Sequence, residues 1–423
     1  MHKDCVFTIV AKNYIGLGEI LGKSLHKYNP EVDFKIFVAD EFRVKPDILP
    51  AEVVIAKEIL KWDECRYRDM SFKYNLTEFC TAIKPGCGLY LLSQGYEKVI
   101  YLDPDIFIYS SISPILESLD SHEMCLTPQV LGIHKEYTGE HPEWHMNVNG
   151  IFNLGFFGIR NTPNMKKLLE WWDIRLIDSC FSERTLGQFT DQKWMDWAHG
   201  FLGDGRVTTL CNLGINMAPW NFFERKIVKD GDVFFVEFRT DENKGRDRLI
   251  FIHFSGYDYR KMKNGEVYHN RMNLNDYPDL ADVMGLYRDA IVEDADLFDS
   301  FITEEYSYSK YENGDMIEPF HRRLYHGLPI DIRINTNPFN CGEGTFHNQL
   351  RKKSLIDTSL QMMNISSLKK GDLSNKRRII ERLFKLIFNI GGYKRYAPFL
   401  KSLYEYCRPE MHTFLIEKEN IKK

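Results

Sequence analysis

Two aspartates interrupt an apolar stretch, Lys98-Val-Ile-Tyr-Leu-Asp103-Pro-Asp105-Ile-Phe-Ile-Tyr109. The β-branched, aromatic and aliphatic residues on either side of them are typical of a strand that is covered on both faces in an α/β sheet. Alternation along a strand points residues i and i+2 to the same side, and Pro104 restricts the backbone between the two acids. We therefore expect Asp103 and Asp105 to lie together at the end of a buried strand.

A divalent cation would stabilise this pair of acids. Burying one unpaired carboxylate is costly, and burying two close together costs more. Oxygen ligands suit Mg²⁺ or Mn²⁺ better than zinc, and these ions commonly bind together with the phosphates of a substrate. The alternative is a strand end whose acids lie in solvent. Haloacid-dehalogenase phosphatases also begin with Asp-x-Asp, but a small, glycine-containing loop follows there, whereas Ile106-Phe-Ile-Tyr109 follows here.

Length and composition fit a large enzyme. A chain of 423 residues can form one large catalytic domain with an appendage, and 43% hydrophobic and 14% aromatic residues suffice for its core. A net charge of −5 gives no reason to expect nucleic-acid binding. The nine cysteines include no Cys-x-x-Cys pair, which indicates reduced thiols. The N-terminus enters a strand without a signal peptide, and no window resembles a membrane span, so we expect a cytoplasmic protein.

The N-terminal segment has a β-α-β pattern. Val6–Ala11 is expected to form a strand, Lys12–Tyr14 a loop, Gly16–Tyr28 a helix and Phe34–Asp40 a second strand. Open α/β sheets bind ligands at the carboxyl ends of their strands. We therefore expect a ligand near the loop that follows the first strand.

Glycines 16, 18 and 22, followed by Asp40, resemble a loose dinucleotide fingerprint. A dehydrogenase would place its first glycine directly after the strand, but four residues intervene here and the spacing is not Gly-x-Gly-x-x-Gly. An NAD-dependent oxidoreductase is therefore an alternative interpretation only.

Three further segments carry candidate site residues. Lys84 precedes Pro85 at the joint between two predicted helices, where it could approach a diphosphate or lie solvated on the surface. Ile151–Arg160 is expected to be a strand, and its glycines indicate close approach of a ligand or another backbone. His253 ends an apolar strand; a single histidine there is usually a core residue, but with two upstream acids it becomes a candidate metal ligand.

Two other segments are expected to serve as scaffold and lid. Thr162-Pro163 is expected to cap a helix whose apolar residues recur at helical spacing: Met165, Leu168, Leu169, Trp172 and Leu176. The polar loop from His134 to Asn149 contains several histidines, but their spacing fits no familiar zinc site. We expect this segment to be an acceptor-side loop or a lid.

Four short motifs occur in the order Asp103-x-Asp105, Phe-Asn153-x-Gly, Asp191-Gln192 and His253-Phe-x-Gly256. This order resembles a retaining glycosyltransferase family that includes glycogenin and the bacterial lipooligosaccharide galactosyltransferases, over about residues 5 to 260. The resemblance implies the GT-A fold, an α/β architecture with a Rossmann-like mixed sheet flanked by helices. It also implies a nucleotide-diphosphate sugar, such as a UDP-sugar, as donor.

The resemblance also implies roles for individual residues. Asp103, Asp105 and His253 would bind Mn²⁺ or Mg²⁺. Asn153 would lie beside the donor sugar, and Asp191 and Gln192 would line the reaction centre. The residues expected at the nucleoside are Ala11, Asn13 and Tyr14, with Tyr14 stacked on the base.

One departure from the family concerns the diphosphate. The family usually continues its late motif as Gly-x-x-Lys-Pro-Trp, whereas here Gly256 is followed by Tyr-Asp-Tyr-Arg260-Lys261. Lys84, Gly256 and Arg260, or Lys261 in place of Arg260, are the candidate contacts. A retaining reaction needs no strong base, but Asp191 or Asp196 could act as one if the enzyme inverts.

The last third is expected to be mainly helical, so that residues 1–265 form the catalytic domain and 266–423 a separate region. Residues 327–342 alternate in hydrophobicity and contain turn residues, which predicts a loop or hairpin. Residues 369–401 combine many lysines and arginines with isoleucines and leucines at helical spacing. Such a helix could lie on the inner membrane leaflet or pack on the catalytic domain.

Together these features predict a cytoplasmic glycosyltransferase that acts on a glycan or lipid-linked acceptor in bacterial surface polysaccharide synthesis. Peripheral association with the inner membrane leaflet is an alternative to a location away from the membrane. The rival from another class is a non-catalytic nucleotide-sugar-binding protein on the same fold. No nucleic acid is expected as a partner.

Overall fold

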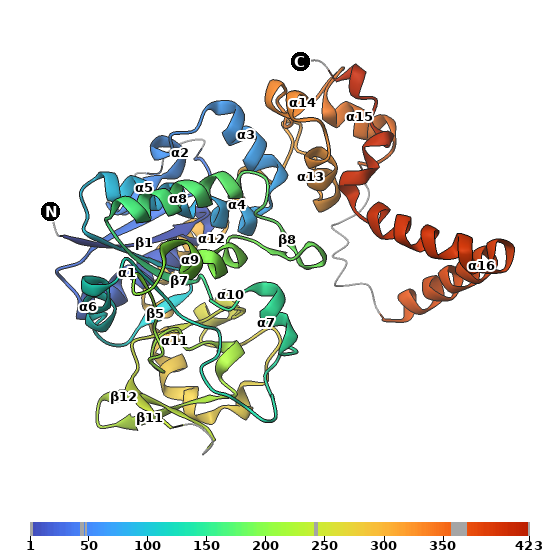
Figure 1. The fold of residues 1–423 in the computed structure, drawn as a ribbon. Coiled ribbons are helices and arrows are strands. Elements are labelled where there is room, and N and C mark those ends of the chain that lie inside the picture. Colours follow the sequence, from blue (N-terminus) through green and yellow to red (C-terminus); the bar gives the residue numbers. More distant parts are fainter. Residues whose placement is uncertain (1–2, 43–45, 47–48, 241–243, 357–369, 422–423) are drawn as a thin grey trace. The chain divides into compact units, whose positions relative to one another are not determined.

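The computed structural model describes residues 3–42, 46, 49–240, 244–356 and 370–421, which divide into two compact units (Figure 1). The first comprises Met1–Trp62 and Leu76–Ser307, and the second Asp63–Asn75 and Tyr308–Lys423. These units differ from the predicted ranges 1–265 and 266–423. Helices α11 (Ala281–Glu293) and α12 (Ala295–Ile302) pack in the first unit, whereas α3 (Glu64–Lys73) packs in the second.

A seven-stranded mixed sheet forms the centre of the first unit. Its strand order is β10-β6-β7-β4-β1-β2-β3; β7 is antiparallel to β4 and β6, and the other neighbours are parallel. The strands are β1 (Asp4–Val10), β2 (Asp33–Val38), β3 (Val53–Ile55), β4 (Lys98–Leu102), β6 (Met124–Leu126), β7 (Phe156–Arg160) and β10 (Val207–Thr209). This arrangement confirms the predicted α/β class.

Helices cover both faces of this sheet (Figure 1). On one face, Val6 and Ile100 pack in a core with apolar residues of α1 (Ile15–Tyr28) and α6 (Ser113–Ser121). On the other, Phe157 contacts Trp172 of α8 (Pro163–Leu176), which packs beside α5 (Lys84–Ser93). Alternation along each strand divides its side chains between the two cores. The prediction for α8 is confirmed: Thr162 caps it by accepting from Met165 N, and all five predicted apolar residues are buried.

The glycines of the loose dinucleotide pattern lie inside α1 and serve packing. A Cβ on Gly16 would lie 2.8 Å from the Cα of Phe298, and one on Gly22 would lie 2.7 Å from the ring of Phe34. The helix can therefore lie against its neighbours only where these side chains are absent. The structure accounts for the pattern without a phosphate-binding turn.

Shorter elements surround the sheet. Strand β5 (Ile106–Ile108) leaves the main sheet and pairs with β14 (Phe251–His253). Three strands form a separate antiparallel sheet: β11 (Arg225–Asp230), β12 (Val233–Phe238) and β13 (Arg246–Arg248). Other elements are η1 (Lys12–Tyr14), α2 (Ala56–Ile59), α4 (Leu76–Ala82), α7 (Trp144–Asn149), β8 (Ser182–Glu183), β9 (Gln188–Phe189), η3 (Gln192–Trp197), α9 (Ala198–Leu202) and α10 (Tyr259–Lys263).

The second unit is helical, as predicted for the C-terminal region. Phe72 of α3 lies at its centre and contacts the rings of Tyr325 and Phe346. The buried guanidinium of Arg322 donates to the carbonyl oxygens of Phe72 and Tyr74 at 2.6 and 2.9 Å. These contacts fasten α3 to helices that lie about 250 residues later in the chain. The later helices are α13 (Pro319–His326), α14 (Ile330–Asn335), α15 (Phe346–Lys352) and α16 (Lys370–Tyr406).

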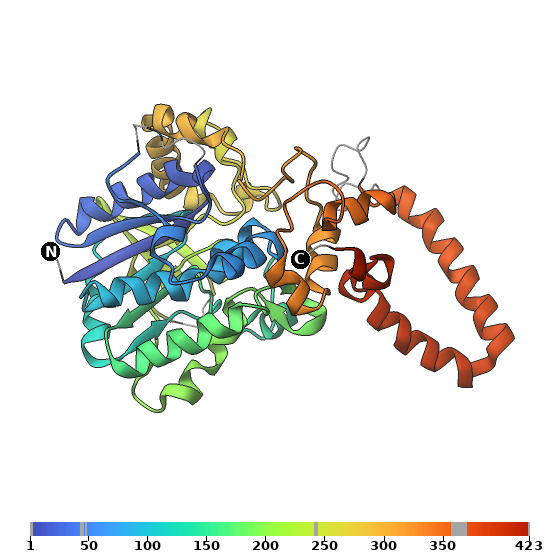
Figure 2. The same ribbon diagram turned by 90° about the horizontal axis from the view of Figure 1, so that it is seen from above.

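Two predicted segments lie in this unit. The hairpin alternative for residues 327–342 is wrong, because residues 330–335 form the helix α14 directly after Pro329. Residues 336–342 form a loop with turns, as the loop alternative predicts for that part. The basic helix expected over residues 369–401 lies within α16, although residue 369 is outside the described residues. The backbone of α16 is not helical at Gly392, and Figure 2 shows that this helix bends back on itself. Among the described residues, no helix is long and apolar enough to cross a membrane.

Candidate metal and donor site

The ends of two strand pairs bring Asp103, Asp105 and His253 together. Asp103 follows β4, and its backbone N–H donates to the carbonyl of Gly155 at 2.8 Å. Strand β5 begins just after Asp105 and runs antiparallel to β14, with Ile106 opposite His253. The N–H of Phe254 donates to the carbonyl of Asp105 at 2.7 Å. Residues separated by about 150 positions are thus fixed beside one another by backbone pairing.

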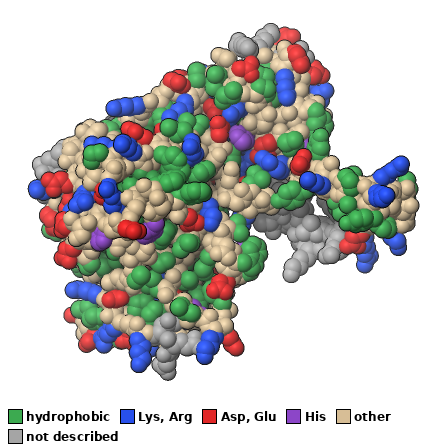
Figure 3. Space-filling model, in the orientation of Figure 1, with side chains coloured by type: hydrophobic (Ala, Val, Ile, Leu, Met, Phe, Trp, Pro, Cys, Tyr) green, Lys and Arg blue, Asp and Glu red, His purple; other side chains and the backbone are tan. Residues whose placement is uncertain are grey.

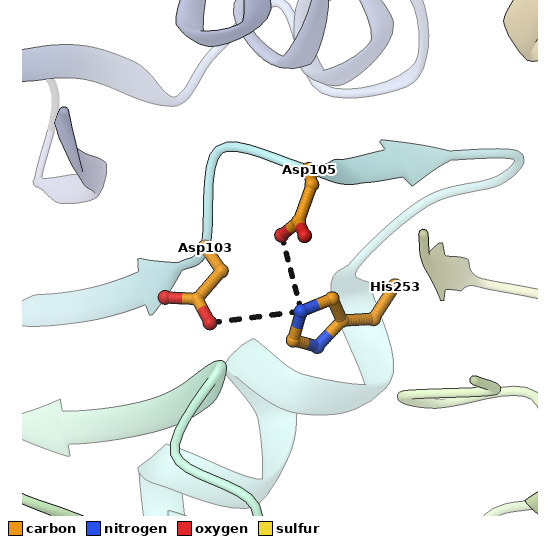
Figure 4. A group of neighbouring side chains, drawn as sticks. All are labelled: Asp103, Asp105 and His253. Carbon is orange, nitrogen blue, oxygen red and sulfur yellow. Dashed lines mark ion pairs between the residues drawn. The ribbon is translucent and has the colours of Figure 1, made fainter. Parts of the chain in front are cut away.

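The three side chains converge on one point (Figure 4). His253 Nε2 lies 3.0 Å from an oxygen of Asp105 and 3.6 Å from one of Asp103. One ligand atom from each residue lies within 4.8 Å of the other two. The two carboxylates suit Mn²⁺ or Mg²⁺, and the imidazole suits Mn²⁺ better than the harder Mg²⁺. The residues present therefore fit the predicted cation.

Electrostatics favour a positive charge at this point. Burial raises the pKa of Asp105, but the charge and hydrogen bond of His253 outweigh it, so the pKa lies below its usual value. Burial lowers the pKa of His253, but the carboxylate of Asp105 and then that of Asp103 raise it above the usual value. A cation between the carboxylates would supply the charge that the protonated imidazole otherwise provides.

Gly155 makes room for the imidazole. A Cβ at this position would lie 2.4 Å from His253 Cε1 and 2.6 Å from Nδ1. The prediction that a ligand or another backbone approaches this glycine is wrong, because the group that lies against it is the side chain of His253. The predicted strand over Ile151–Arg160 is shorter than expected, because only Phe156–Arg160 is a strand and Asn153 lies in the turn before it.

A network of amides joins Asn153 to Gln192. Asn153 Oδ1 accepts from the N–H of Gly155 at 3.1 Å and from Asn216 Nδ2 at 3.2 Å. Gln192 Oε1 accepts from the N–H of Leu154 at 3.1 Å, and its Nε2 donates to the carbonyl of Asn149. These bonds hold the Phe-Asn-x-Gly turn beside η3, which carries Gln192. The residue predicted beside the donor sugar, Asn153, and one of the two predicted for the reaction centre, Gln192, thus lie in one network.

Lys84 and Asp191 form a buried ion pair next to the acids. Lys84 Nζ lies 3.0 Å from Asp191 and 3.7 Å from Asp103, and it donates to the carbonyl of Leu154 at 2.8 Å. Burial lowers the pKa of Lys84, but the carboxylates of Asp191 and then Asp103 raise it above its usual value, so the side chain is a cation. The alternative of a solvated surface lysine is wrong.

Two cavities meet at Tyr14. One, of about 260 Å³, is lined by Ala11, Tyr14, Asp103 and Asp105 among other residues. The other, of about 250 Å³, is lined by Asn13, Tyr14 and Arg260 among others. The rings of Tyr14 and Tyr259 lie edge to face, with centroids 6.3 Å apart. Gly256 lines neither cavity; it occupies a turn with φ of 84°.

Sequence reasoning missed three polar residues of this site. The hydroxyl of Tyr101 donates to Asp103, that of Tyr259 donates to Asp105 at 3.3 Å, and Asn216 holds Asn153. Tyr259 stands three positions after Gly256, where the resembled family has its lysine, so position alone could have identified it. No comparable signal marked Asn216, which contacts Asn153 only through the fold.

The polar loop contributes one histidine to a different contact. His134 Nε2 lies 3.0 Å from the buried carboxylate of Glu224, which also accepts from the N–H groups of Leu131 and Gly132. In the part of the chain that the structure describes, Asp103, Asp105 and His253 are the only group with metal-binding geometry. Glu224 therefore fastens the start of this loop, and its role as a lid stays a prediction.

Comparison with known proteins gives distant similarities. No protein-family model matches the chain. The uncharacterized protein YfnF of Bacillus subtilis (strain 168) is 25% identical over 262 residues, which cover 59% of this chain and 80% of YfnF.

The solved structures that resemble this chain include several glycosyltransferases. The galactosyltransferase LgtC, in complex with donor and acceptor sugar analogues, is 16% identical, with a TM-score of 0.38 over 72% of this chain and 98% of LgtC. GlyE of Streptococcus pneumoniae TIGR4 is 14% identical, with a TM-score of 0.35 over 74% of this chain and 67% of GlyE. Mouse xyloside xylosyltransferase 1 is 11% identical, with a TM-score of 0.31 over 52% of this chain and 88% of that enzyme.

Proposed function

We propose that this protein is a metal-dependent GT-A glycosyltransferase that uses a nucleotide-diphosphate sugar, a UDP-sugar in the first instance. The observation that carries the proposal is the convergence of Asp103, Asp105 and His253 at a cavity. The two acids also line that cavity, together with the Ala11 to Tyr14 segment. A ligand in it would contact protein aromatic groups and the cation together. A nucleoside diphosphate has both groups that such a ligand needs: a base that can stack on an aromatic ring and phosphates that bind a cation.

The chemistry follows from the leaving group. Breaking the bond between a sugar and a diphosphate leaves negative charge on the phosphate, and a divalent cation held by the three ligands would stabilise that charge. Lys84 adds a second, fixed positive charge 3.7 Å from Asp103. Because Lys84 is buried, its charge is weakly screened by water. Asn153 and Gln192 would position the donor sugar through their shared network.

The partners of the acidic side chains favour a retaining reaction. Asp191 pairs with Lys84 at 3.0 Å and accepts from Thr190. Asp196 pairs with Lys193 at 2.7 Å and accepts from the N–H of Ile151. An inverting enzyme needs a carboxylate that can take a proton from the acceptor. Both candidate bases already form an ion pair and accept a hydrogen bond within the protein, which supports transfer without a strong base.

We further propose that the acceptor is a glycan or lipid-linked glycan of bacterial surface polysaccharide synthesis and that transfer occurs in the cytoplasm. The exposed basic helix in the second unit supports a lipid-linked acceptor, because such a substrate would be presented at the inner membrane leaflet. Comparing free and lipid-linked acceptors in a transfer assay tests this part separately from donor use.

The experiment that tests donor use combines binding with turnover. Purified protein is titrated with UDP and Mn²⁺ in a calorimeter, and UDP release is followed across a panel of UDP-sugars with Mn²⁺ and with chelator. We expect Mn²⁺-dependent turnover that Asp103→Ala and Asp105→Ala abolish. Asp120→Ala, which removes an exposed acid paired with Lys98, is the matched control and should leave turnover unchanged. Turnover that survives both substitutions and chelation contradicts the metal assignment.

The same experiment separates catalysis from simple binding. UDP binding without turnover of any donor would favour the non-catalytic alternative. A gain in fluorescence on adding NADH, with no response to UDP, would favour the oxidoreductase.

A further inference from the structure

Helix α16 is two arms joined by a bend. Gly392, with φ of 59° and ψ of 179°, separates the first arm, residues 370–391, from the second arm, residues 393–406. Figure 2 shows the two arms of the helix. Phe384 contacts Phe399 across the arms, with ring centroids 6.4 Å apart, and Phe388 contacts Tyr396 at 5.4 Å. These aromatic pairs hold the inner sides of the arms together. The opposite side of the first arm, its outer side, therefore points away from the second arm.

The outer side of the first arm carries an exposed apolar row. Ile379, Leu383, Leu386 and Ile390 follow one another at spacings of four, three and four residues, which places them on one face of a helix. Their side chains are 66%, 52%, 54% and 74% exposed. A continuous row of large apolar side chains in water indicates a surface that is covered in the functional state.

A row of cations runs alongside the apolar row. Arg378, Arg382 and Lys385 each immediately precede a residue of that row, so they lie about 100° away around the helix and are exposed. Residues 378–406 contain six lysines and arginines but only two glutamates. Figure 3 shows basic and hydrophobic side chains side by side on this helix pair.

We infer that the first arm of α16 lies in the headgroup region of an anionic lipid bilayer, with its apolar row toward the acyl chains. Its cations would reach the lipid phosphates while their aliphatic stems remain among apolar groups. Anionic lipid neutralises this row of charge, whereas pairing two copies of the chain through the same face would bring like charges together. The inference rests on the second unit alone and goes beyond sugar transfer.

Vesicle sedimentation of the full-length protein tests this inference. We expect binding to vesicles of phosphatidylcholine mixed with phosphatidylglycerol, weaker binding to phosphatidylcholine alone, and a decline as salt is raised. Arg382→Glu combined with Lys385→Glu should reduce binding roughly tenfold or more, because each basic residue near an anionic surface contributes to affinity. Leu383→Ser combined with Leu386→Ser should reduce it comparably.

The control reverses two charges elsewhere. Lys166→Glu combined with Lys167→Glu changes the net charge equally on exposed positions of α8 and should leave vesicle binding intact. All substituted positions are exposed, so the fold should be kept, as circular dichroism can verify. Equal binding by the two charge-reversed proteins would overturn the inference. Failure of the unmodified protein to bind either kind of vesicle would also overturn it. If ultracentrifugation then showed a dimer that the leucine substitutions dissociate, the apolar row would instead be a contact between two copies of the chain.

Discussion

The ammonium nitrogen of Lys84 lies 3.0 Å from a carboxylate oxygen of Asp191, and each side chain is only 2% exposed. A buried pair of this kind is costly to break, because the remaining charge is left without a partner or water. The pair also links α5, which begins at Lys84, to η3, which begins just after Asp191. It therefore fixes one wall of the candidate site relative to another.

Lys84→Met should lower the free energy of unfolding by about 3 kcal/mol, since it leaves the buried carboxyl group of Asp191 without its partner. Urea denaturation measures the effect. Lys84→Met combined with Asp191→Asn should recover part of the loss, because no buried charge remains. Lys3→Met, at an exposed lysine that pairs with Glu97, is the control and should change stability by less than about 1 kcal/mol. Equal effects of the two lysine substitutions would contradict a buried ion pair.

Gly155→Ala should displace the imidazole of His253, because the new methyl group would lie 2.4 Å from its Cε1. We expect Mn²⁺ affinity to fall at least tenfold, with a loss of about 1 to 3 kcal/mol in stability from overpacking. Calorimetric titration with Mn²⁺ measures the first effect and urea denaturation the second. In Gly200→Ala the added methyl group has no atom within 4 Å, so this control should bind Mn²⁺ normally. Unchanged affinity in Gly155→Ala would show that His253 is not a ligand.

Tyr259→Phe should weaken the metal site without unfolding the protein. The hydroxyl of Tyr259 donates to the carbonyl of Phe254 at 2.9 Å and to Asp105 at 3.3 Å, so it helps to orient the Asp105 carboxylate. Groups that orient a metal ligand commonly contribute about tenfold to metal affinity. We expect a loss of that size in Mn²⁺ titration, with a loss of only about 1 kcal/mol in the free energy of unfolding without metal, from the lost hydrogen bond to Phe254. A variant that binds Mn²⁺ as tightly as the unmodified chain would limit Tyr259 to a packing role.

Residues whose chemistry is local were predictable, and those that depend on distant partners were not. Asp103 and Asp105 could be found because two acids inside an apolar strand are costly without a cation. His253 was predictable as well, because a cation bound by two acids needs further ligands. Asn216 could not be found, because only the fold brings its amide to Asn153.

The same distinction applies to the fold. The capped, periodic helix α8 was predicted in full, since all of its signals are local. Residues 330–335 alternate as a strand would, yet Ile330 and Ile334 are exposed and the segment is helical, so the pattern did not reflect a buried sheet face. The position of α3 in the second unit depends on the contacts of Phe72 with rings more than 250 residues away, which no local pattern could indicate.

Glu19→Gln should stabilise the protein at high pH. Burial, followed by the charge of Glu52, raises the pKa of Glu19 from 4.5 to about 7. The folded state therefore binds this proton more tightly than the unfolded state, so its stability is greatest below the unfolded pKa and is lost as the pH rises to about 7. Glutamine stays neutral and avoids that loss. Because Glu19 is partly exposed, we expect a gain of about 1 kcal/mol above pH 7 and almost none near pH 4.5. Melting temperatures across this range test the prediction, with Glu31→Gln at an exposed position as the control; a constant difference between Glu19→Gln and the unmodified chain would contradict a raised pKa.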